Sequence, residues 1–243
     1  MITRNPSLTD QVKTNIKERI VNDEFNEGRI PPETELATDL GVSRTTVRDA
    51  LSRLENEGAI YRKQGAGTFV NEPGLQIKSR LEEIWSYEQV LEDHGYTPSV
   101  RVLSSRARPA DDDTARILSL DPNTPVLIIE KLFIEDDEPV MLTVNQIPTK
   151  IVHDAEYEKD EATPIYEFLE DHCDRTLGYY LSEIIPVSLD ADLAAKLGVE
   201  SGTLAISFNE IGFDQSNEPI VRATSYFRDD LLRFRLIRRK SGT

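Results

Sequence analysis

The segment that most constrains the fold contains two short helix patterns separated by about three residues. The first helix is predicted over 33–40, with proline and glutamate at its start, and Gly41 is suited to end it. Ser43 is suited to cap a second helix, whose apolar residues recur at helical spacing until Gly58 stops it. Two helices joined by so short a turn around a glycine predict a helix-turn-helix motif.

The flanking segments complete a small domain. Apolar residues recur every four positions between 8 and 22, which predicts an amphipathic helix before the motif. After the motif, short strands are predicted at 59–63 and 68–70, on either side of a glycine-bearing turn. A hairpin in this place is typical of a winged helix-turn-helix domain, which we expect over residues 1–72.

The outward face of the motif's second helix carries side chains that could read DNA. Arginine pairs with guanine edges, hydroxyl groups suit phosphates and thymine edges, and glycines let a wing backbone approach the duplex closely. A solvated helix with ordinary surface arginines is the simpler alternative. The candidate DNA-binding residues are Arg44, Thr45, Thr46, Arg48, Arg62, Lys63, Gln64, Gly65 and Gly67.

Four sequence blocks resemble the DNA-binding domain of the GntR family. They are PETELA at 32–37, LGVSRTTVR at 40–48, LENEG at 54–58 and GAGTFV at 65–70. The resemblance implies that Arg44 and Arg48 contact bases or phosphates, that the threonines between them give support, and that Gly65 lies at the wing tip. Thr34 departs from the pattern, because some members carry a DNA-contacting arginine there, so no operator sequence follows beyond inverted GT…AC-type repeats.

The net charge of −16 does not exclude a DNA partner, because the acidity is unevenly distributed. Residues 1–74 hold 10 Lys or Arg and 12 Asp or Glu, a net charge of −2, whereas the remainder holds 18 and 32, a net charge of −14. The N-terminal domain can therefore present a basic face, while an acidic C-terminal domain would be repelled from the duplex.

Composition favours a soluble protein of the cytoplasm. No apolar run approaches the roughly 20 residues that span a bilayer. The polar segment from Met1 to Thr14 lacks the features of a secretory signal. The one cysteine, Cys173, excludes an internal disulfide and a multi-cysteine zinc site, so we expect it to be structural and expect no metal or cofactor.

The C-terminal part contains an internal repeat with a spacing of about eighty residues. An acidic helix start at Asp111 is followed by a leucine-rich turn, a threonine, a strand and Glu138-Pro139, and the same order recurs from Asp190 to Glu218-Pro219. Each copy predicts a strand, a short helix and a long hairpin, which indicates an α+β fold with a mixed, mostly antiparallel sheet. An accidental resemblance between two hairpins is the alternative.

Glu72-Pro73-Gly74 is predicted to break the preceding pattern, which gives a linker over 73–80 and a second domain over 81–243. The elements predicted in that domain are a helix over 81–94, hairpins over 126–147 and 204–227, and a last strand over 234–237.

This layout is similar to the UTRA effector domain of the HutC subgroup of GntR regulators, a domain that resembles chorismate lyase in fold. The sequence signals are GYTP at 95–98, Glu138-Pro139 and SYFRDDLLRF at 225–234. The resemblance implies a homodimer in which a small molecule, bound in this domain, reorients two DNA-binding domains.

Departures from the subgroup bear on the effector. Members that bind sugar phosphates place arginines at the positions of Lys131 and Phe133, a serine at that of Glu88 and a glutamate near Val221. Because Glu88 would repel a phosphate, we expect an effector that is not a sugar phosphate. The candidate effector-binding residues, each of which could equally be a core aromatic or a surface charge, are Tyr87, Glu88, Lys131, Phe133, Tyr166, Arg222 and Tyr226.

The sequence contains no nucleotide-binding GxxxxGK[ST], GxSxG or HExxH motif, and its three histidines are dispersed. We therefore predict a regulator without enzymatic activity, most simply a repressor that the effector releases from its operator. Two alternatives stay open: a chorismate-lyase-like enzyme with a DNA-binding appendage, and a constitutive DNA-binding protein whose C-terminal domain only dimerises.

Overall fold

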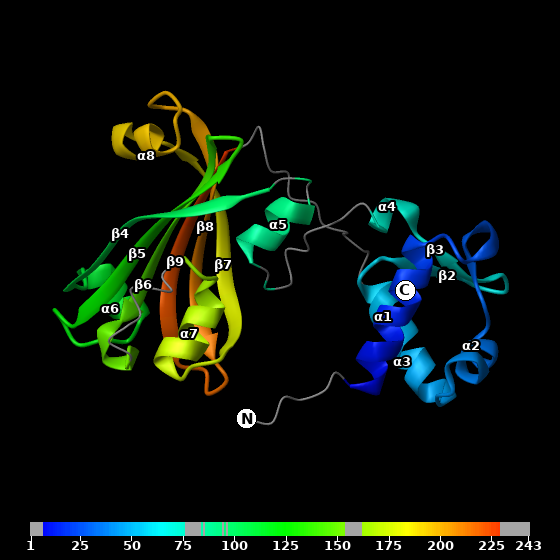
Figure 1. The fold of residues 1–243 in the computed structure, drawn as a ribbon. Coiled ribbons are helices and arrows are strands. Elements are labelled where there is room, and N and C mark those ends of the chain that lie inside the picture. The colour runs from blue at the N-terminus through cyan, green and yellow to red at the C-terminus, as the bar shows by residue number, and fades with distance from the viewer. Residues whose placement is uncertain are drawn as a thin grey trace. The chain divides into compact units, whose positions relative to one another are not determined.

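The computed structural model describes residues 7–75, 84, 86–93, 95, 97–153 and 162–228. The chain divides into an N-terminal unit, with described residues 7–75, and a C-terminal unit, with those from 84 to 228 (Figure 1). No described helix is long and apolar enough to cross a membrane. The predicted strand over 234–237 and most of the predicted linker over 73–80 lie outside the described residues.

The N-terminal unit consists of three helices, a small sheet and a terminal helical turn. Its elements are α1 (Leu8–Val21), η1 (Asn26–Gly28), β1 (Arg29–Ile30), α2 (Glu33–Leu40), α3 (Arg44–Asn56), β2 (Ile60–Lys63), β3 (Gly67–Val70) and α4 (Glu72–Leu75). The strands form an antiparallel sheet in the order β1-β3-β2. The winged helix-turn-helix predicted from the sequence is confirmed, with β1 as an additional strand.

Residues at the helix ends explain where these helices begin and stop. Ser7 Oγ accepts a hydrogen bond from the Asp10 amide at 3.2 Å, and Ser43 Oγ accepts one from the Thr46 amide at 3.1 Å, so both serines act as N-caps. Gly41 ends α2 in the left-handed conformation, with φ of 65°. The inward faces of α1, α2 and α3 share one core, formed mainly by Val12, Ile16, Ile20, Leu36, Val47, Ala50, Leu51 and Leu54.

The segment after the wing is helical, so the prediction that Glu72-Pro73-Gly74 ends the regular structure is wrong. Asn71 fixes this turn, because its carbonyl oxygen accepts hydrogen bonds from the amides of Gly74 and Leu75. Its side-chain amide donates to the Gly58 carbonyl at 2.7 Å. Proline is tolerated in the first turn of a helix, so α4 extends the domain to Leu75, which packs against the core.

The C-terminal unit is built on a six-stranded antiparallel sheet with the strand order β4-β5-β6-β9-β8-β7. Its strands are β4 (Ser99–Pro109), β5 (Pro125–Glu135), β6 (Glu138–Pro148), β7 (Leu177–Ser188), β8 (Leu204–Asp214) and β9 (Pro219–Arg228). Its helices are α5 (Tyr87–Asp93), α6 (Asp112–Ile117), η2 (Thr149–Ile151), α7 (Ile165–Cys173) and α8 (Ala191–Lys196). The predicted α+β class and both predicted hairpins are confirmed.

The sheet consists of two copies of one supersecondary unit, as the sequence repeat predicts. The series α5-β4-α6-β5-β6 corresponds to α7-β7-α8-β8-β9, and the ladder between β6 and β9 joins the two copies. Asp111 and Asp190 cap α6 and α8 in the same way, by accepting hydrogen bonds from the amides of Thr114 at 2.6 Å and Leu193 at 2.9 Å. An approximate two-fold axis therefore passes through the middle of the sheet.

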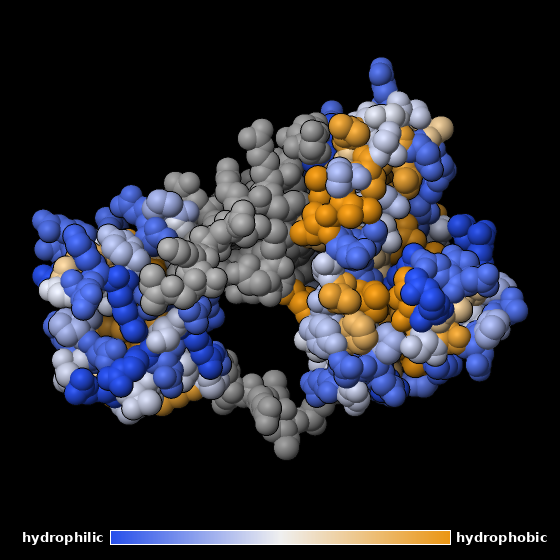
Figure 2. Space-filling view, turned by 180° about the vertical axis from the view of Figure 1, so that it is seen from behind, coloured by the Kyte–Doolittle hydropathy of each residue, from blue (hydrophilic) through white to orange (hydrophobic). Residues whose placement is uncertain are grey.

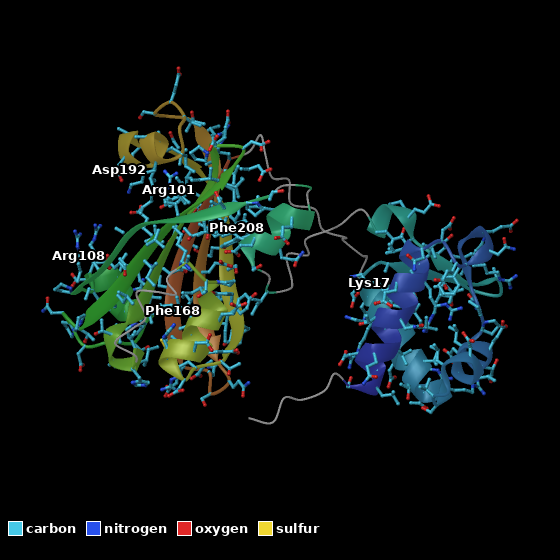
Figure 3. All side chains as sticks on the ribbon, in the orientation of Figure 1. Lys17, Arg101, Arg108, Phe168, Asp192 and Phe208 are labelled. Carbon is cyan, nitrogen blue, oxygen red and sulfur yellow. The ribbon has the colours of Figure 1, made fainter. Side chains whose placement is uncertain are left out.

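The helices cover the sheet in two layers, with α5 and α7 on one face and α6 and α8 on the other. Figure 3 shows Phe168 on α7 and Asp192 on α8. Because side chains alternate along a strand, Leu127 and Ile129 of β5 pack with Phe168, whereas Leu132 packs with α8. Each face of the sheet thus has its own core, and a site on one face is separated from the other by the sheet.

Candidate functional site

The N-terminal end of α3 presents polar side chains to solvent. Arg44, Thr45 and Arg48 are exposed, as predicted from the helical pattern, while Thr46 is half-buried. The Thr46 and Ser43 hydroxyl oxygens lie 2.8 Å apart, so Thr46 supports the cap of the helix. In helix-turn-helix proteins this end of the second helix enters the major groove.

The two arginines of α3 differ in their surroundings. Arg48 Nε and Nη2 donate to the Glu33 carboxylate of α2 at 3.1 and 2.9 Å. These hydrogen bonds hold the pKa of Glu33 below its usual range. Arg44 makes no ion pair with any described residue. A duplex would therefore meet Arg44 as a free charge, whereas Arg48 must exchange a carboxylate for a base or phosphate.

The wing is the hairpin of β2 and β3. Gly65 and Gly67 have φ of 75° and 121°, conformations that L side chains rarely adopt, so glycine is required at both positions. The other predicted wing residues, Arg62, Lys63 and Gln64, are all exposed. The hairpin therefore offers backbone and cationic groups together.

Arg29 is a basic wing residue that the sequence analysis missed. It lies on β1, directly opposite Phe69 of β3, and its Nη2 donates to the Ala66 carbonyl at 3.2 Å. This places the guanidinium at the wing turn. A two-residue strand has no periodicity, so no sequence pattern marks it.

Ion pairing concentrates the uncompensated positive charge of the N-terminal unit. Within residues 7–75, the basic residues that make no ion pair are Lys17, Arg29, Arg44 and Lys63. Three of these four belong to the recognition helix or the wing sheet. The acidic composition of the unit is thus compatible with a locally basic surface.

The C-terminal unit contains a cavity of about 420 Å³ on the face covered by α5 and α7. Strands of both halves of the sheet contribute to its walls. Five predicted effector-binding residues line it, namely Tyr87, Glu88, Lys131, Phe133 and Tyr166. A volume of this size suits a small organic molecule.

A hydrogen-bonded group of polar side chains occupies one side of the cavity. Tyr87 OH donates to Glu210 at 3.3 Å and shares a hydrogen bond of 2.7 Å with Ser225 Oγ. Ser182 Oγ donates to the other Glu210 oxygen at 2.6 Å. Burial raises the pKa of Glu210 above its usual range, although both hydroxyl donors oppose that effect.

Lys131 lies on β5 and is only 3% exposed. Its Nζ donates to the Thr163 carbonyl at 2.5 Å. Burial raises the pKa of Glu88, and the positive charge of Lys131 opposes this rise. Asn145 of β6 also lines the cavity; the residue is 5% exposed, and its side-chain amide makes no hydrogen bond with any described residue.

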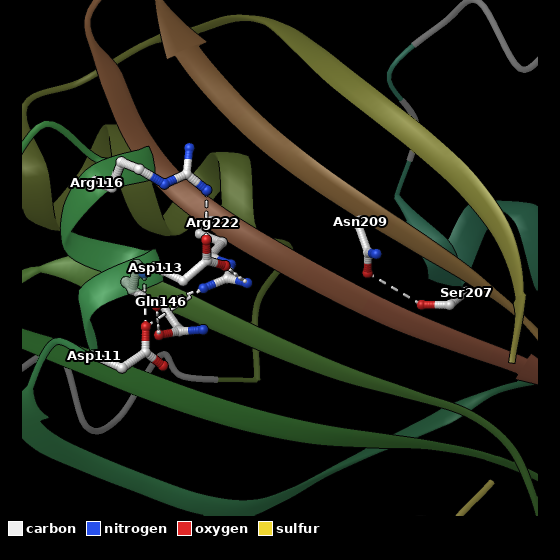
Figure 4. A network of polar contacts seen from close by, with 8 residues as sticks. Asp111, Asp113, Arg116, Gln146, Ser207, Asn209 and Arg222 are labelled. Carbon is white, nitrogen blue, oxygen red and sulfur yellow. Dashed lines mark hydrogen bonds and ion pairs between the residues drawn. The ribbon is translucent and has the colours of Figure 1, made fainter. Parts of the chain in front are cut away.

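Arg222 and Tyr226, which were predicted as effector-binding residues, do not line this cavity. On β9, Ala223 faces the cavity and even-numbered residues point to the opposite face. There the Arg222 guanidinium donates to Asp113 at 2.8 Å and to Thr114 at 2.6 Å (Figure 4). Tyr226 packs with the core beneath α8.

Several cavity residues were not among the candidates. The most informative are Asn145, Tyr180, Ser182 and Glu210. A signal for one of them is present in the sequence repeat, because Glu210 occupies in β8 the place that Lys131 occupies in β5. Combining the repeat spacing with strand alternation would have identified it.

Cys173 belongs to the core under α7 rather than to a reactive site. The side chain is fully buried, and burial raises the pKa of its thiol to about 12. The sequence-based expectation of a structural cysteine agrees with this environment.

A winged helix-turn-helix with an exposed recognition helix, followed by a separate domain with a cavity, defines a ligand-responsive class of DNA-binding protein. Comparisons with known families agree. The family described as "Bacterial regulatory proteins, gntR family" matches this chain over residues 8–70, and the UTRA domain family matches it over residues 93–233. The chain belongs to the UTRA-domain family and carries a GntR-type DNA-binding domain, which makes it a transcription regulator.

Similar proteins have the same organisation. The chain is 27% identical to the HTH-type transcriptional repressor NagR of Bacillus subtilis over 93% of this chain and 91% of that protein. It is 26% identical to the mannosyl-D-glycerate transport/metabolism system repressor MngR of Escherichia coli, over 97% and 98% of the two chains. The crystal structure of the possible transcriptional regulator YydK from Bacillus subtilis has the same fold, with a TM-score of 0.75, 17% identity, and coverage of 96% of this chain and 100% of that chain.

Proposed function

We propose that the protein is a homodimeric repressor of the HutC subgroup whose operator binding is weakened by a small molecule in the C-terminal cavity. The observation that carries this proposal is the presence, on one chain, of an exposed cationic recognition-helix end and a separate cavity lined by polar groups. Ligand-biased occupancy of two dimer geometries would couple the two sites, because only one spacing of recognition helices fits two half-sites.

The proposed DNA-binding residues are those of the recognition helix and the wing. Exposure, helix capping and glycine geometry support Arg44, Thr45, Thr46, Arg48, Arg62, Lys63, Gln64, Gly65 and Gly67, and Arg29 is added to them. The uncompensated charges of Arg29, Arg44 and Lys63 would supply phosphate contacts.

The proposed effector is not a sugar phosphate. Lys131 is the one basic residue among the described residues that line the cavity, whereas Glu88 and Glu210 both line it. A dianionic phosphate would therefore enter a site with an excess of carboxylates. The proposed effector-binding residues are Tyr87, Glu88, Lys131, Phe133 and Tyr166.

The edge strand β7 supports the homodimer. Leu181 is 58% exposed and Ile185 is 38% exposed on the sheet face opposite the cavity. Figure 2 shows apolar residues gathered on the side of the C-terminal unit that carries β7. An antiparallel edge can pair with a second copy of itself about a two-fold axis, which would cover these residues. The change Leu181→Asp with Ile185→Asp should yield a monomer by light scattering, whereas the exposed control Val21→Asp should not.

Selection from random duplexes would identify an operator, and fluorescence anisotropy with the full chain would then test regulation. We expect Arg44→Ala to weaken operator binding and a metabolite found by melting shift to lower operator affinity. A constitutive DNA-binding protein would bind its operator equally with and without every metabolite that stabilises it. Unselective binding by the wild-type chain would refute the proposal.

A further inference from the structure

Glu210 is the polar group of the cavity with the most unusual surroundings. Both of its oxygens accept hydrogen bonds from neutral hydroxyl groups, those of Tyr87 and Ser182. No described residue forms an ion pair with it. Lys131 belongs to the other half of the sheet, where its Nζ donates to the Thr163 carbonyl and its charge acts on Glu88. A carboxylate is thus held in the cavity wall without a cationic partner.

Three aromatic residues line the cavity together with this carboxylate. Tyr87 of α5, Tyr180 of β7 and Phe208 of β8 all line the cavity with Glu210. Gly212, two residues further along β8 and on the same face, makes room for one of these rings, because a Cβ there would lie 2.9 Å from Tyr180 Cε1. A carboxylate in a cavity that aromatic side chains also line can stabilise an organic cation, by charge attraction and, where a ring face meets the cation, by the ring quadrupole.

Asn145 adds an independent observation on the facing strand. Its amide lines the cavity, is 5% exposed and has no hydrogen-bonding partner among the described residues. The amide atoms are not fully enclosed by protein, so this group is available to a polar atom of a bound molecule. The apolar walls, which include Phe133 and Ile184, suit a hydrocarbon or aryl part.

We propose that the effector carries a cationic ammonium group, which Glu210 binds on the side of the cavity that Tyr87, Tyr180 and Phe208 also line, and an apolar part that fills the rest of the cavity. The inference rests on the proposed sensor function and specifies the class of its effector. The raised pKa of Glu210 agrees with it, because burial without a counter-charge has this effect and a bound cation would oppose it.

Three probes of one shape test the charge requirement: 2-phenylethylammonium, 2-phenylethanol and phenylacetate. Isothermal titration calorimetry on the full chain should show the ammonium ion binding at least about tenfold more tightly than the alcohol or the anion. Glu210→Gln should remove this preference. Glu183→Gln, an identical change at an exposed position of β7, should leave it intact.

The proposal would be overturned if phenylacetate or the alcohol bound as tightly as the ammonium ion, or if none of the three bound. It would also be overturned if the preference for the ammonium ion survived Glu210→Gln. Thermal melting of each variant verifies that it is folded. Operator binding is measured separately, so a chain that prefers the ammonium ion but binds no operator selectively would refute the regulator function and leave the ligand class standing.

Discussion

The two arginines of the recognition helix should contribute unequally to operator binding, because only one has an intramolecular partner. Arg44 forms no ion pair among the described residues, whereas Arg48 donates three hydrogen bonds to Glu33, at 3.3, 3.1 and 2.9 Å. DNA must displace Glu33 to reach Arg48. The changes Arg44→Ala, Arg48→Ala and Glu33→Gln, with the double change at 33 and 48, separate these contributions.

The structure sets the expected magnitudes. Loss of a base contact by Arg44→Ala should cost about 1–3 kcal/mol of binding free energy per recognition helix. Arg48→Ala should weaken binding less than Arg44→Ala does. The two losses of affinity should differ by a factor of about two to five, because DNA must first break the Arg48–Glu33 pair and an exposed ion pair usually contributes this much. Glu33→Gln should tighten binding by a similar factor of about two to five, because it releases Arg48 and removes a negative charge facing the phosphates.

Anisotropy titrations at several salt concentrations test this account. Each lost phosphate contact should reduce the slope of log affinity against log salt by about 0.9 per recognition helix. Arg53→Ala is the matched control, because Arg53 lies at the other end of α3, is 51% exposed and also pairs with a carboxylate, that of Asp10. If Glu33→Gln leaves affinity unchanged or acts equally in the presence and absence of Arg48, the competition between Glu33 and DNA does not exist.

Three further outcomes follow from single contacts. Gly74→Ala should destabilise the N-terminal unit by about 2–4 kcal/mol, because the new Cβ would lie 1.9 Å from the Gly58 carbonyl oxygen, and a Gly41→Ala control with open space around it should cost only about 1–2 kcal/mol, both measured by chemical denaturation. Burial raises the pKa of Glu210, so the folded chain binds the carboxyl proton more tightly than the unfolded chain does, and stability is lost as pH rises from the unfolded to the folded pKa. Glu210→Gln should therefore melt at a higher temperature than wild type at about pH 8 and lose this advantage at about pH 4. Asp111→Ala and Asp190→Ala should each cost about 1 kcal/mol and add in the double variant, since the caps they remove lie in separate halves.

The N-terminal unit was predictable because its signals are local. Caps at Ser43, breaks at Gly41 and Gly58 and helical spacing act within one element, and the observed helices α2 and α3 begin and end where these residues place them. The exception is α4, where a turn depends on the tertiary hydrogen bond from Asn71 to Gly58. A contact between residues thirteen positions apart leaves no mark in local sequence.

The cavity was predictable only in part, because it depends on which face of each strand a residue occupies. Lys131 and Phe133 line the cavity, whereas Arg222 and Tyr226 point to the opposite face of β9. A shift of one residue reverses every assignment along a strand, and the ladder between β8 and β9 contains such a shift near Gly212. Registers of this kind are set by pairing with neighbouring strands, which composition does not record.

The two halves of the sheet carry opposite charges at equivalent positions in the cavity wall. Lys131 and Glu210 occupy equivalent places in the two halves, where two like charges would repel each other. Opposite charges remove that repulsion, and Glu88 of α5 balances Lys131 on one side only. Because α5 carries both Tyr87, which donates to Glu210, and Glu88, a ligand held by Glu210 as proposed would act on this helix. Ligand binding and DNA binding can thus be coupled through α5 without a rearrangement of the sheet.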